Sequence, residues 1–395
     1  MKSALWLLPD GIEELLPDDA ERIEAFRNQL LGLYHSWGYQ MVVPPLVEFL
    51  DSLLTGVGQD LELQTFKLTD QATGRLMGVR ADMTPQVARI DARFHPADRA
   101  NRLCYIGSVL RTRARTQLSS RSPLQSGCEL FGVSGDEADI EIISLMLEAL
   151  RLTGVQPVHL DLSHVAISRR LLTLSGLDEA AQATLSDAWR RKAVPEVDQI
   201  SGRVADPKIA DAIRALPRSM VSLSELHTLV SRFGTDEVMK ASLLSLQRVA
   251  GVIATRFPEV EICFDLCEMR GYNYHTGLFF AAYSPGFGQA IAEGGRYDGV
   301  GEQFGTRRSA TGFSVDLRAL LKSRGEATRP PVNGILVPAD ADETAWPLIQ
   351  TLRQTEAVIC EMPGDTPAAL RTRCNRRLVR ETNGQWCVKE WNLDD

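Results

Sequence analysis

The sequence contains no long apolar run. Its 395 residues include no stretch of about eighteen or more apolar residues, so a membrane-spanning helix is not expected. A short apolar patch near the N-terminus ends at Pro9 and Asp10, too early for the apolar region of a signal peptide, and no small-residue cleavage site follows. These absences predict a cytoplasmic protein.

Cysteine is sparse. The seven cysteines are scattered and odd in number, so a disulfide framework is not expected. Cys263 and Cys267 lie close together, but no second pair of cysteines or histidines follows at the spacing of a zinc site, and a strand is their expected setting. Five histidines show neither metal-site nor triad spacing and are expected to be structural: His35, His95, His159, His164 and His227. The sequence therefore predicts no metal site.

An excess of positive charge is also missing. The formal net charge is -8 at pH 7, which gives the chain no general attraction for the phosphate backbone of nucleic acids. A local exception is a group of arginines, formed by Arg111, Arg113, Arg115 and Arg121. Two interpretations stay open for this group, a phosphate- or RNA-binding patch and a solvated loop between strands.

Several segments show the apolar spacing of amphipathic helices. The clearest covers residues 18–37, where Ile23 and Phe26 begin an apolar stripe and acidic residues at the start favour the helix dipole. Thr84 followed by Pro85 predicts the start of a second helix. Further helices are expected over residues 138–152, after Gly312 with Phe313 and Leu317 on the apolar face, and over residues 342–354.

Strand patterns surround these helices. Residues 41–50 read as a β-branched strand that Pro44 and Pro45 interrupt, so it should lie at an edge or an interface. Residues 278–283 and 289–292 flank the turn SPGFG and predict a hairpin. The other expected strands cover residues 103–109, 128–132, 158–162, 260–266, 334–337 and 357–360. Together with a helical, more polar stretch over residues 163–257, this order predicts a mixed α+β fold with a large antiparallel sheet.

Three stretches in sequence order carry a family resemblance. The first is GYQMVVPPLVEFLDSLLTGVG with VRADMT, the second is LRTRARTQLSSRSPLQSGCELFG, and the third combines MRGYNYHTGLFF, EGGRYDGV and TGFSVDLRALL. Together they resemble the motifs of class II aminoacyl-tRNA synthetases in the form found in histidyl-tRNA synthetases. The resemblance covers roughly residues 1–325. It implies an antiparallel sheet flanked by helices with a helical insertion at about 163–257, then a linker at 326–332 and a small degenerate α/β domain at 333–395.

The resemblance also implies a binding site for free histidine. Asp82, Thr84 and Gln125 would face the ammonium group, Arg111 and Arg270 the carboxylate, and Glu129 and Tyr297 the imidazole, with His275 beside them. A carboxylate suits an ammonium group and a guanidinium fork suits a carboxylate. The sequence departs from the family at two positions, because Asp82 replaces a glutamate and His275 replaces a tyrosine. Taken singly, Arg111 could be a surface arginine and Glu129 a paired carboxylate within a sheet.

The ATP half of the family's site is altered. Arg318 and Ala319 stand where the family has a glutamate–arginine pair whose arginine binds the γ-phosphate, and Arg113 stands where an acidic residue orients the adenine ring. Adenylation needs the phosphates of ATP to be neutralised. The resemblance therefore implies that histidine is bound without being activated. No catalytic residue, metal or cofactor is expected, and L-histidine is the expected allosteric ligand.

Relatives that combine these features with a short C-terminal segment are the regulatory subunits of ATP phosphoribosyltransferase. This resemblance implies a hetero-oligomer with a short-form catalytic subunit that performs the first step of histidine biosynthesis, with feedback inhibition by histidine. It also implies a dimer formed through the Pro44–Pro45 region, and no binding of tRNA or membranes. Two alternatives stay open: a divergent histidyl-tRNA synthetase or other amino-acid-activating paralogue, and a binding module that regulates another process.

Overall fold

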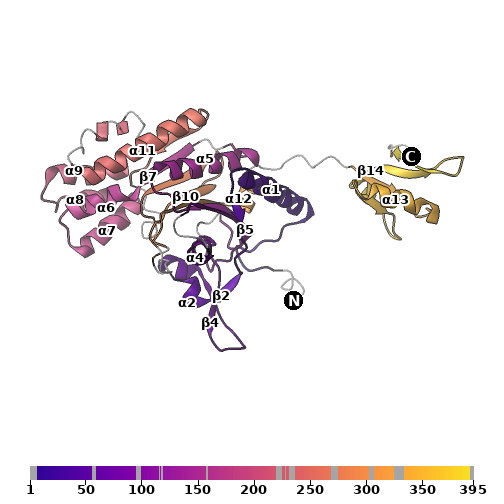
Figure 1. Ribbon diagram of the computed structural model, residues 1–395, viewed down its shortest axis with the longest axis horizontal. Coiled ribbons are helices and arrows are strands. Elements are labelled where there is room, and N and C mark those ends of the chain that lie inside the picture. The colour runs from indigo at the N-terminus through magenta and orange to yellow at the C-terminus, as the bar shows by residue number, and fades with distance from the viewer. Residues whose placement is uncertain are drawn as a thin grey trace. The chain divides into compact units, whose positions relative to one another are not determined.

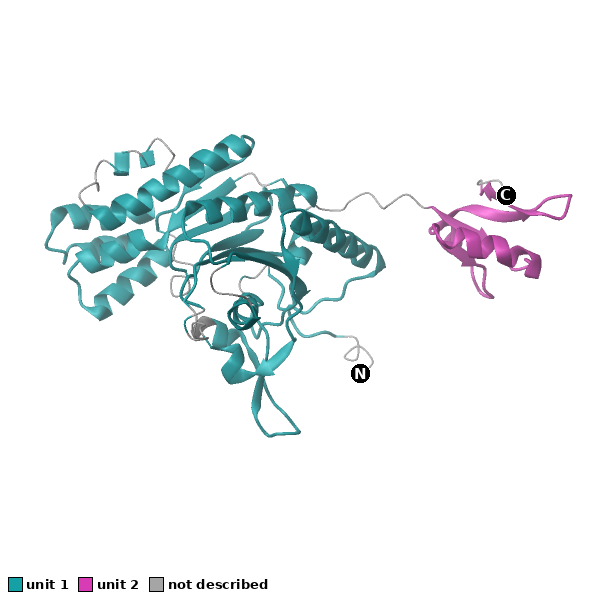
Figure 2. Ribbon diagram, viewed as in Figure 1, with its two compact units in different colours: residues 1–325 teal, residues 326–395 magenta. Residues whose placement is uncertain are grey.

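A computed structural model gives the fold in Figure 1. It describes residues 7–55, 59–94, 99–114, 116, 119–156, 159–218, 225–226, 228–230, 236–267, 275–300, 302, 307–323 and 333–391. The chain forms two compact units, residues 1–325 and residues 326–395 (Figure 2). The expected linker at 326–332 lies outside the described residues. Within the described part of the chain, no helix has both the length and the apolar character needed to cross a membrane.

The first unit contains an eight-stranded sheet with the order β1-β5-β6-β11-β10-β9-β7-β8. Its strands are β1 (Gln40–Met41), β5 (Asn101–Ser108), β6 (Leu124–Phe131), β7 (His159–His164), β8 (Glu261–Phe264), β9 (Leu278–Tyr283), β10 (Ala292–Arg296) and β11 (Ala310–Asp316). The central pairs are antiparallel, and the outermost pairs, β1 with β5 and β7 with β8, are parallel. The predicted α+β fold with a large antiparallel sheet is confirmed.

Helices cover one face of this sheet (Figure 1). They are α1 (Pro17–Ser36), α5 (Asp136–Leu152), α11 (Glu237–Arg256) and α12 (Leu317–Ser323). α1 begins with a proline and two aspartates, which suit the first turn of a helix, and it buries Ile23, Phe26, Leu30 and Tyr34 against the sheet side of the core. α5 is buried on most of its sides, because it packs against α1, α11 and the strands of the sheet. The main core therefore forms between this helical layer and one sheet face.

The opposite face carries α4 (Thr84–Phe94) and a smaller core that includes Met83, Val87 and Tyr105. Beside it lies a three-stranded sheet of β2 (Val47–Phe49), β3 (Phe66–Thr69) and β4 (Leu76–Val79), with the short helices α2 (Leu50–Leu53) and α3 (Gln59–Gln64). The proline-interrupted strand predicted over residues 41–50 is thus divided into β1 and β2. β1 lies at an edge of the main sheet, which agrees with the edge position predicted for the proline-interrupted strand, and Pro44 and Pro45 lie between β1 and β2.

The helical insertion leaves the sheet after β7 and returns at β8. It contains α6 (Val165–Leu174), α7 (Glu179–Arg190), α8 (Val194–Ser201), α9 (Pro207–Ala215), the 3-10 turn η2 (Leu216–Arg218) and α11. Aspartates at positions 178, 206 and 236 cap α7, α9 and α11 by accepting backbone N–H bonds. α11 packs against both β7 and β8, so it forms the return path of the chain to the sheet.

The second unit forms a four-stranded sheet with the order β13-β12-β14-β15. Its elements are β12 (Gly334–Val337), η4 (Glu343–Ala345), α13 (Trp346–Leu352), β13 (Val358–Cys360), α14 (Pro367–Arg371), β14 (Cys374–Arg380) and β15 (Trp386–Glu390). It has its own apolar core around Ile335, Ile349 and Leu378.

Three sequence predictions were wrong in detail. Phe313 lies in strand β11 rather than in a helix, which begins only at Leu317. The second hairpin strand covers Ala292–Arg296 rather than residues 289–292, because its glycines accommodate close neighbours instead of forming a turn. The last sixty or so residues were predicted to form two strands with one helix between them. They also contain α14 and the strands β14 and β15, which were missed. Val158, predicted in a strand, lies outside the described residues.

Candidate functional site

Glu129 lies near the end of β6, on the sheet face away from the helical layer. It is buried and pairs in register with Gly312 of β11. A β-carbon at Gly312 would overlap the Glu129 carboxylate and would lie 2.7 Å from the carbonyl oxygen of Cys128. Glycine at this position therefore leaves space in the sheet for the carboxylate.

Three hydroxyl groups bond to Glu129. Thr84 Oγ1 and Tyr105 OH each donate to Glu129 Oε1 at 2.9 Å, and Tyr297 OH donates to Glu129 Oε2. Burial raises the pKa of Glu129 to about 8, although the three hydroxyl bonds act in the opposite direction. The carboxyl group thus changes its protonation state near neutral pH, where an imidazole also titrates.

Asp82 extends this arrangement through the start of α4. Asp82 Oδ1 accepts bonds from the Thr84 amide at 3.0 Å and from Gln125 Nε2 at 3.1 Å. Gln125 Oε1 in turn accepts a bond from the Met83 amide at 2.9 Å. Proximity to Asp82 adds to the rise in the pKa of Glu129. The Asp82 carboxylate in this group suits a cationic group of a ligand.

The structure therefore brings five of the predicted histidine-binding residues into one hydrogen-bonded group. We call it the Glu129 cluster, and it consists of Asp82, Thr84, Tyr105, Gln125, Glu129 and Tyr297. Asp82 precedes α4, Thr84 begins it, and Tyr297 directly follows β10, whereas the other three residues lie in the paired strands β5 and β6.

Arg111 lies next to this cluster. Its side chain is buried, and Nε donates to the carbonyl oxygen of Ala81, the residue before Asp82, at 3.2 Å. Its charge lowers the pKa of Asp316, against the larger raising effect of burial. Arg121 donates from Nε to the Arg111 carbonyl oxygen at 3.1 Å. Arg111 and Arg121, two arginines of the basic group, therefore form hydrogen bonds within the fold. Arg115 of the same group lies outside the described residues, and so does Arg270, the second residue predicted to bind the carboxylate.

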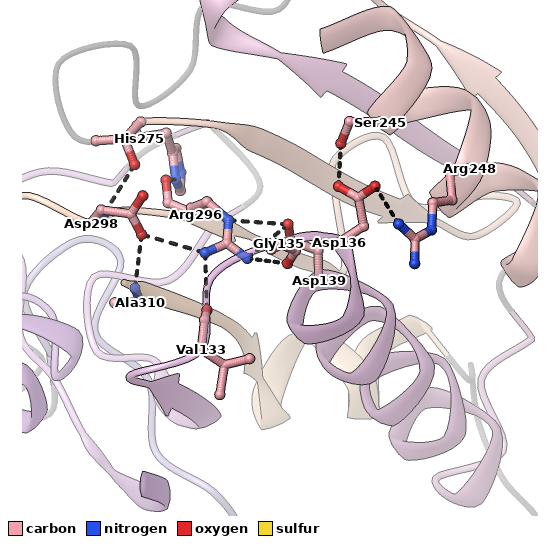
Figure 3. Close-up of polar contacts among 11 residues, drawn as sticks. Val133, Gly135, Asp136, Asp139, Ser245, Arg248, His275, Arg296, Asp298 and Ala310 are labelled. Carbon is pink, nitrogen blue, oxygen red and sulfur yellow. Dashed lines mark hydrogen bonds and ion pairs between the residues drawn. The ribbon is translucent and has the colours of Figure 1, made fainter. Parts of the chain in front are cut away.

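His275 lies beside the cluster and contacts the strand residue that precedes Tyr297. Its Nδ1 is 3.3 Å from the carbonyl oxygen of Arg296, and its ring packs edge-on against Phe279 at a centroid distance of 5.1 Å. Figure 3 shows His275 near Arg296 and Asp298. Among the described residues, His275 therefore contacts the strand that leads to Tyr297.

Arg296 fixes the strand end that carries Tyr297. Its guanidinium lies between Asp139 of α5 and Asp298, and it donates to Asp139 Oδ2 at 3.0 Å and to the Gly135 carbonyl oxygen at 2.7 Å (Figure 3). The side chains of Arg296 and Asp139 are 10% and 3% exposed, so this ion pair is buried. A buried pair with several further bonds holds β10 to the start of α5.

Two of these functional residues were missed from the sequence. Tyr105 faces Gly127 on the neighbouring strand, where a β-carbon would lie 2.5 Å from the tyrosine hydroxyl. A glycine inside a strand next to a buried tyrosine was the available signal, because it marks a close approach. Arg296 lies within the EGGRYDGV stretch but received no role of its own, because its partners Asp139 and Gly135 are remote in sequence.

The residues aligned with the ATP half form no comparable group. Ala319 is buried in α12 with a methyl side chain. Arg318 Nη1 donates to the Glu13 carbonyl oxygen at 2.8 Å. Arg113 is exposed, and it lies two residues after Arg111, which forms an isolated β-bridge with Thr65. The position of the family's phosphate-binding arginine therefore offers no cation, and the neighbouring arginine is directed to the N-terminal segment.

Comparisons with known families match both units of the chain. Residues 11–320 match the histidyl-tRNA synthetase family, and residues 332–389 match the C-terminal domain of ATP phosphoribosyltransferase subunit HisZ. Two similar relatives are named ATP phosphoribosyltransferase regulatory subunit. The protein from Hahella chejuensis is 54% identical over 98% of this chain and 97% of its own, and the protein from Marinobacter nauticus is 50% identical over 97% and 98%.

Solved structures share the fold. One, titled an ATP phosphoribosyltransferase regulatory subunit/histidyl-tRNA synthetase from Bacillus halodurans, has a TM-score of 0.79 at 23% identity and covers 94% of this chain and 97% of its own. A histidyl-tRNA synthetase from a Nostoc species has a TM-score of 0.77 at 18% identity, covering 98% and 97%. These likenesses confirm the class II synthetase-like architecture.

Proposed function

The chain belongs to the family of ATP phosphoribosyltransferase regulatory subunits, and on that premise we propose that its synthetase-like unit binds free L-histidine and reports the histidine level to a catalytic subunit. The observation that carries the proposal is the Glu129 cluster. It joins carboxylates and hydroxyl groups that suit an imidazole and an ammonium group, while Ala319 leaves the aligned ATP position without a cation.

Each polar group of histidine has a partner of suitable charge in this proposal. Asp82 and Gln125 bind the ammonium group, Arg111 with Arg270 binds the carboxylate, and Glu129 with Tyr297 binds the imidazole. A ligand group left unpaired in a buried site would cost about 1–3 kcal/mol. His275 lies next to Arg296, the residue before Tyr297, and so belongs to the imidazole end of the proposed site. No metal or cofactor other than the amino acid takes part.

The partner is a short-form ATP phosphoribosyltransferase catalytic subunit, in keeping with the printed names of the relatives. The proposed complex performs the first step of histidine biosynthesis in the cytoplasm, and histidine bound to this chain inhibits it. Self-association as a dimer involves the edge near β1, where Pro44 and Pro45 separate the main sheet from β2. The proposal includes no binding of tRNA.

The test is a histidine titration of the complex reconstituted from this chain and the catalytic subunit. Glu129→Gln should weaken both inhibition by histidine and calorimetric histidine binding to this chain at least tenfold, which is about 1.4 kcal/mol. Stimulation of the catalytic subunit should stay nearly intact. The matched control is Glu62→Gln, because Glu62 is exposed and pairs only with Lys67 in the described contacts. Unchanged histidine binding in Glu129→Gln would remove Glu129 from the site.

Arg270→Ala is the second variant and tests the carboxylate end with the same readouts. Loss of stimulation together with histidine binding would identify this region as an assembly surface instead. Two further measurements test the partnership and the self-association. The catalytic subunit should lose activity and histidine sensitivity without this chain, and light scattering at micromolar concentration should give a dimer.

A further inference from the structure

A separate group of ligating side chains lies at one edge of the main sheet. His159 stands in β7, Glu261 and Cys263 stand in β8, and one ligand atom from each lies within 4.8 Å of those of the other two. His159 and Cys263 are half-buried and Glu261 is exposed. Because β8 is the edge strand of the sheet, solvent and ions can reach this group.

Strand pairing explains why the side chains meet. β7 and β8 are parallel, with His159 opposite Glu261 and Asp161 opposite Cys263. Residues two apart on a strand point to the same face, so these four side chains form a square on one sheet face. His159 Nε2 lies 2.5 Å from Asp161 Oδ1, which holds the imidazole ring in place.

The donor set matches the preference of zinc. Imidazole nitrogen, thiolate sulfur and carboxylate oxygen are all zinc ligands, and bond lengths of about 2.0–2.3 Å in a tetrahedron separate the donor atoms by about 3.3–3.8 Å. Small side-chain rotations would bring the three donor atoms of His159, Glu261 and Cys263 to that separation. Mg²⁺ and Ca²⁺ prefer sites built from oxygen alone, so the sulfur and nitrogen donors disfavour them. A carboxylate bonded to a ligating histidine is also a common feature of zinc sites.

We propose that His159, Glu261 and Cys263 bind a zinc ion, with Asp161 as the positioning residue that orients the imidazole. The site is distinct from the Glu129 cluster, because β9, β10 and β11 lie between β7 and β6. The ion joins β7, after which the helical insertion begins, to β8, before which it ends. It therefore closes a chain loop of about a hundred residues, between His159 and Glu261, and zinc binding should stabilise the base of the insertion.

The experiment uses the full chain after removal of metals by a chelator. Titration with Co²⁺ should give one equivalent of binding and a thiolate-to-cobalt charge-transfer band, which reports sulfur ligation directly. Cys263→Ser should abolish the band and weaken Zn²⁺ binding, measured by competition with a chromophoric chelator, about a hundredfold. His159→Gln should weaken binding to a similar extent. Asp161→Asn should keep the band but weaken binding about tenfold, as expected for a residue that only orients a ligand.

The matched control is Cys360→Ser, because Cys360 is a half-buried free thiol in β13 of the second unit. It should bind Zn²⁺ and Co²⁺ like the wild type. Histidine binding and far-ultraviolet circular dichroism establish that each variant is folded. The absence of the band in the wild type, its persistence in Cys263→Ser or its loss in Cys360→Ser would each overturn the proposal. In the wild type and in Cys360→Ser, Zn²⁺ should also raise the melting temperature by about 3–5 °C.

Discussion

The two parts of the synthetase-like site differ in how their residues are connected. Around Glu129, hydroxyl groups from three separate elements and an amide side chain link two carboxylates in one buried group. At the aligned ATP positions, Ala319 contributes a methyl group, and Arg318 is bonded to the chain near Glu13. The two sets of positions therefore differ in kind, because one is a connected and buried polar group while the other contains a methyl group and an arginine bonded elsewhere.

Under the proposed function, this difference means that histidine binding and histidine activation depend on separate sets of residues. The Glu129 cluster depends on residues that the strands hold in register, so its geometry comes with the sheet itself. The ATP contacts of the family depend on individual side chains such as the arginine replaced by Ala319. Substitution at these few positions changes side chains in α12 and leaves the paired strands, and with them the Glu129 cluster, in place.

The largest effect on histidine binding is expected from a substitution that fills the space occupied by the Glu129 carboxylate. Gly312→Ala should reduce histidine affinity at least a hundredfold, because its β-carbon would overlap the carboxylate and press on the backbone of β6. The measurement is calorimetric titration with histidine, together with thermal unfolding. Gly32→Ala is the control, since a β-carbon there has no neighbour within 4 Å and alanine favours the helix interior. Near-normal histidine binding in Gly312→Ala would show that the Glu129 cluster is not the site.

A somewhat smaller effect is expected at the anchor of Tyr297. Arg296→Lys should lower the free energy of unfolding by about 2–3 kcal/mol, because an ammonium group cannot replace the guanidinium bonds to Asp139 and Gly135. Chemical denaturation measures this change. Arg307→Lys, at a side chain that is 80% exposed, should change the same quantity by less than about 0.5 kcal/mol. Equal effects of the two substitutions would contradict a role for the buried pair.

The pH dependence of stability sharpens the comparison further. Burial raises the pKa of Glu129 to about 8, so above about pH 4.5 the unfolded chain releases a proton that the folded chain retains. The free energy of unfolding should therefore fall as the pH rises from about 5 through 8. Glu129→Gln removes this contribution, and the wild type should lose at least about 2 kcal/mol more than the variant between about pH 5 and 9.

Comparing the two proteins isolates Glu129 from other groups. His164, whose pKa burial lowers to about 4, makes the folded state less stable at acidic pH in both proteins. Asp139, whose pKa burial raises to about 6, contributes equally to both as well. Denaturant unfolding over a pH series gives the difference, and parallel curves would mean that Glu129 ionises normally.

The smallest effect belongs to the ATP half. Arg113 is exposed, so Arg113→Glu should change histidine affinity less than about twofold, although it restores the charge found in the family. Neither this variant nor the wild type should catalyse histidine-dependent ATP–pyrophosphate exchange, because Ala319 still provides no cation for the phosphates. Exchange above background in highly purified wild type, abolished by Arg111→Ala, would contradict the separation of binding from activation.

Sequence patterns predicted the long elements and the order of the site motifs. The stripe from Ile23 along α1 and the Thr84–Pro85 helix start both correspond to observed helices. β14 was missed because three arginines interrupt its apolar alternation, and β10 was placed too early in the sequence because its glycines do not look like strand residues. Tyr105 could not be assigned, since its contact with Glu129 depends on the register between β5 and β6.

The position of the insertion has a consequence for how the family can diversify. Two neighbouring parallel strands need a crossover of about a dozen residues or more, usually one helix. α11 alone meets that need between β7 and β8, because it packs on both strands. The helices α6 to α9 are therefore topologically dispensable. A change in the length or number of these four helices would leave the strand order of the main sheet unchanged.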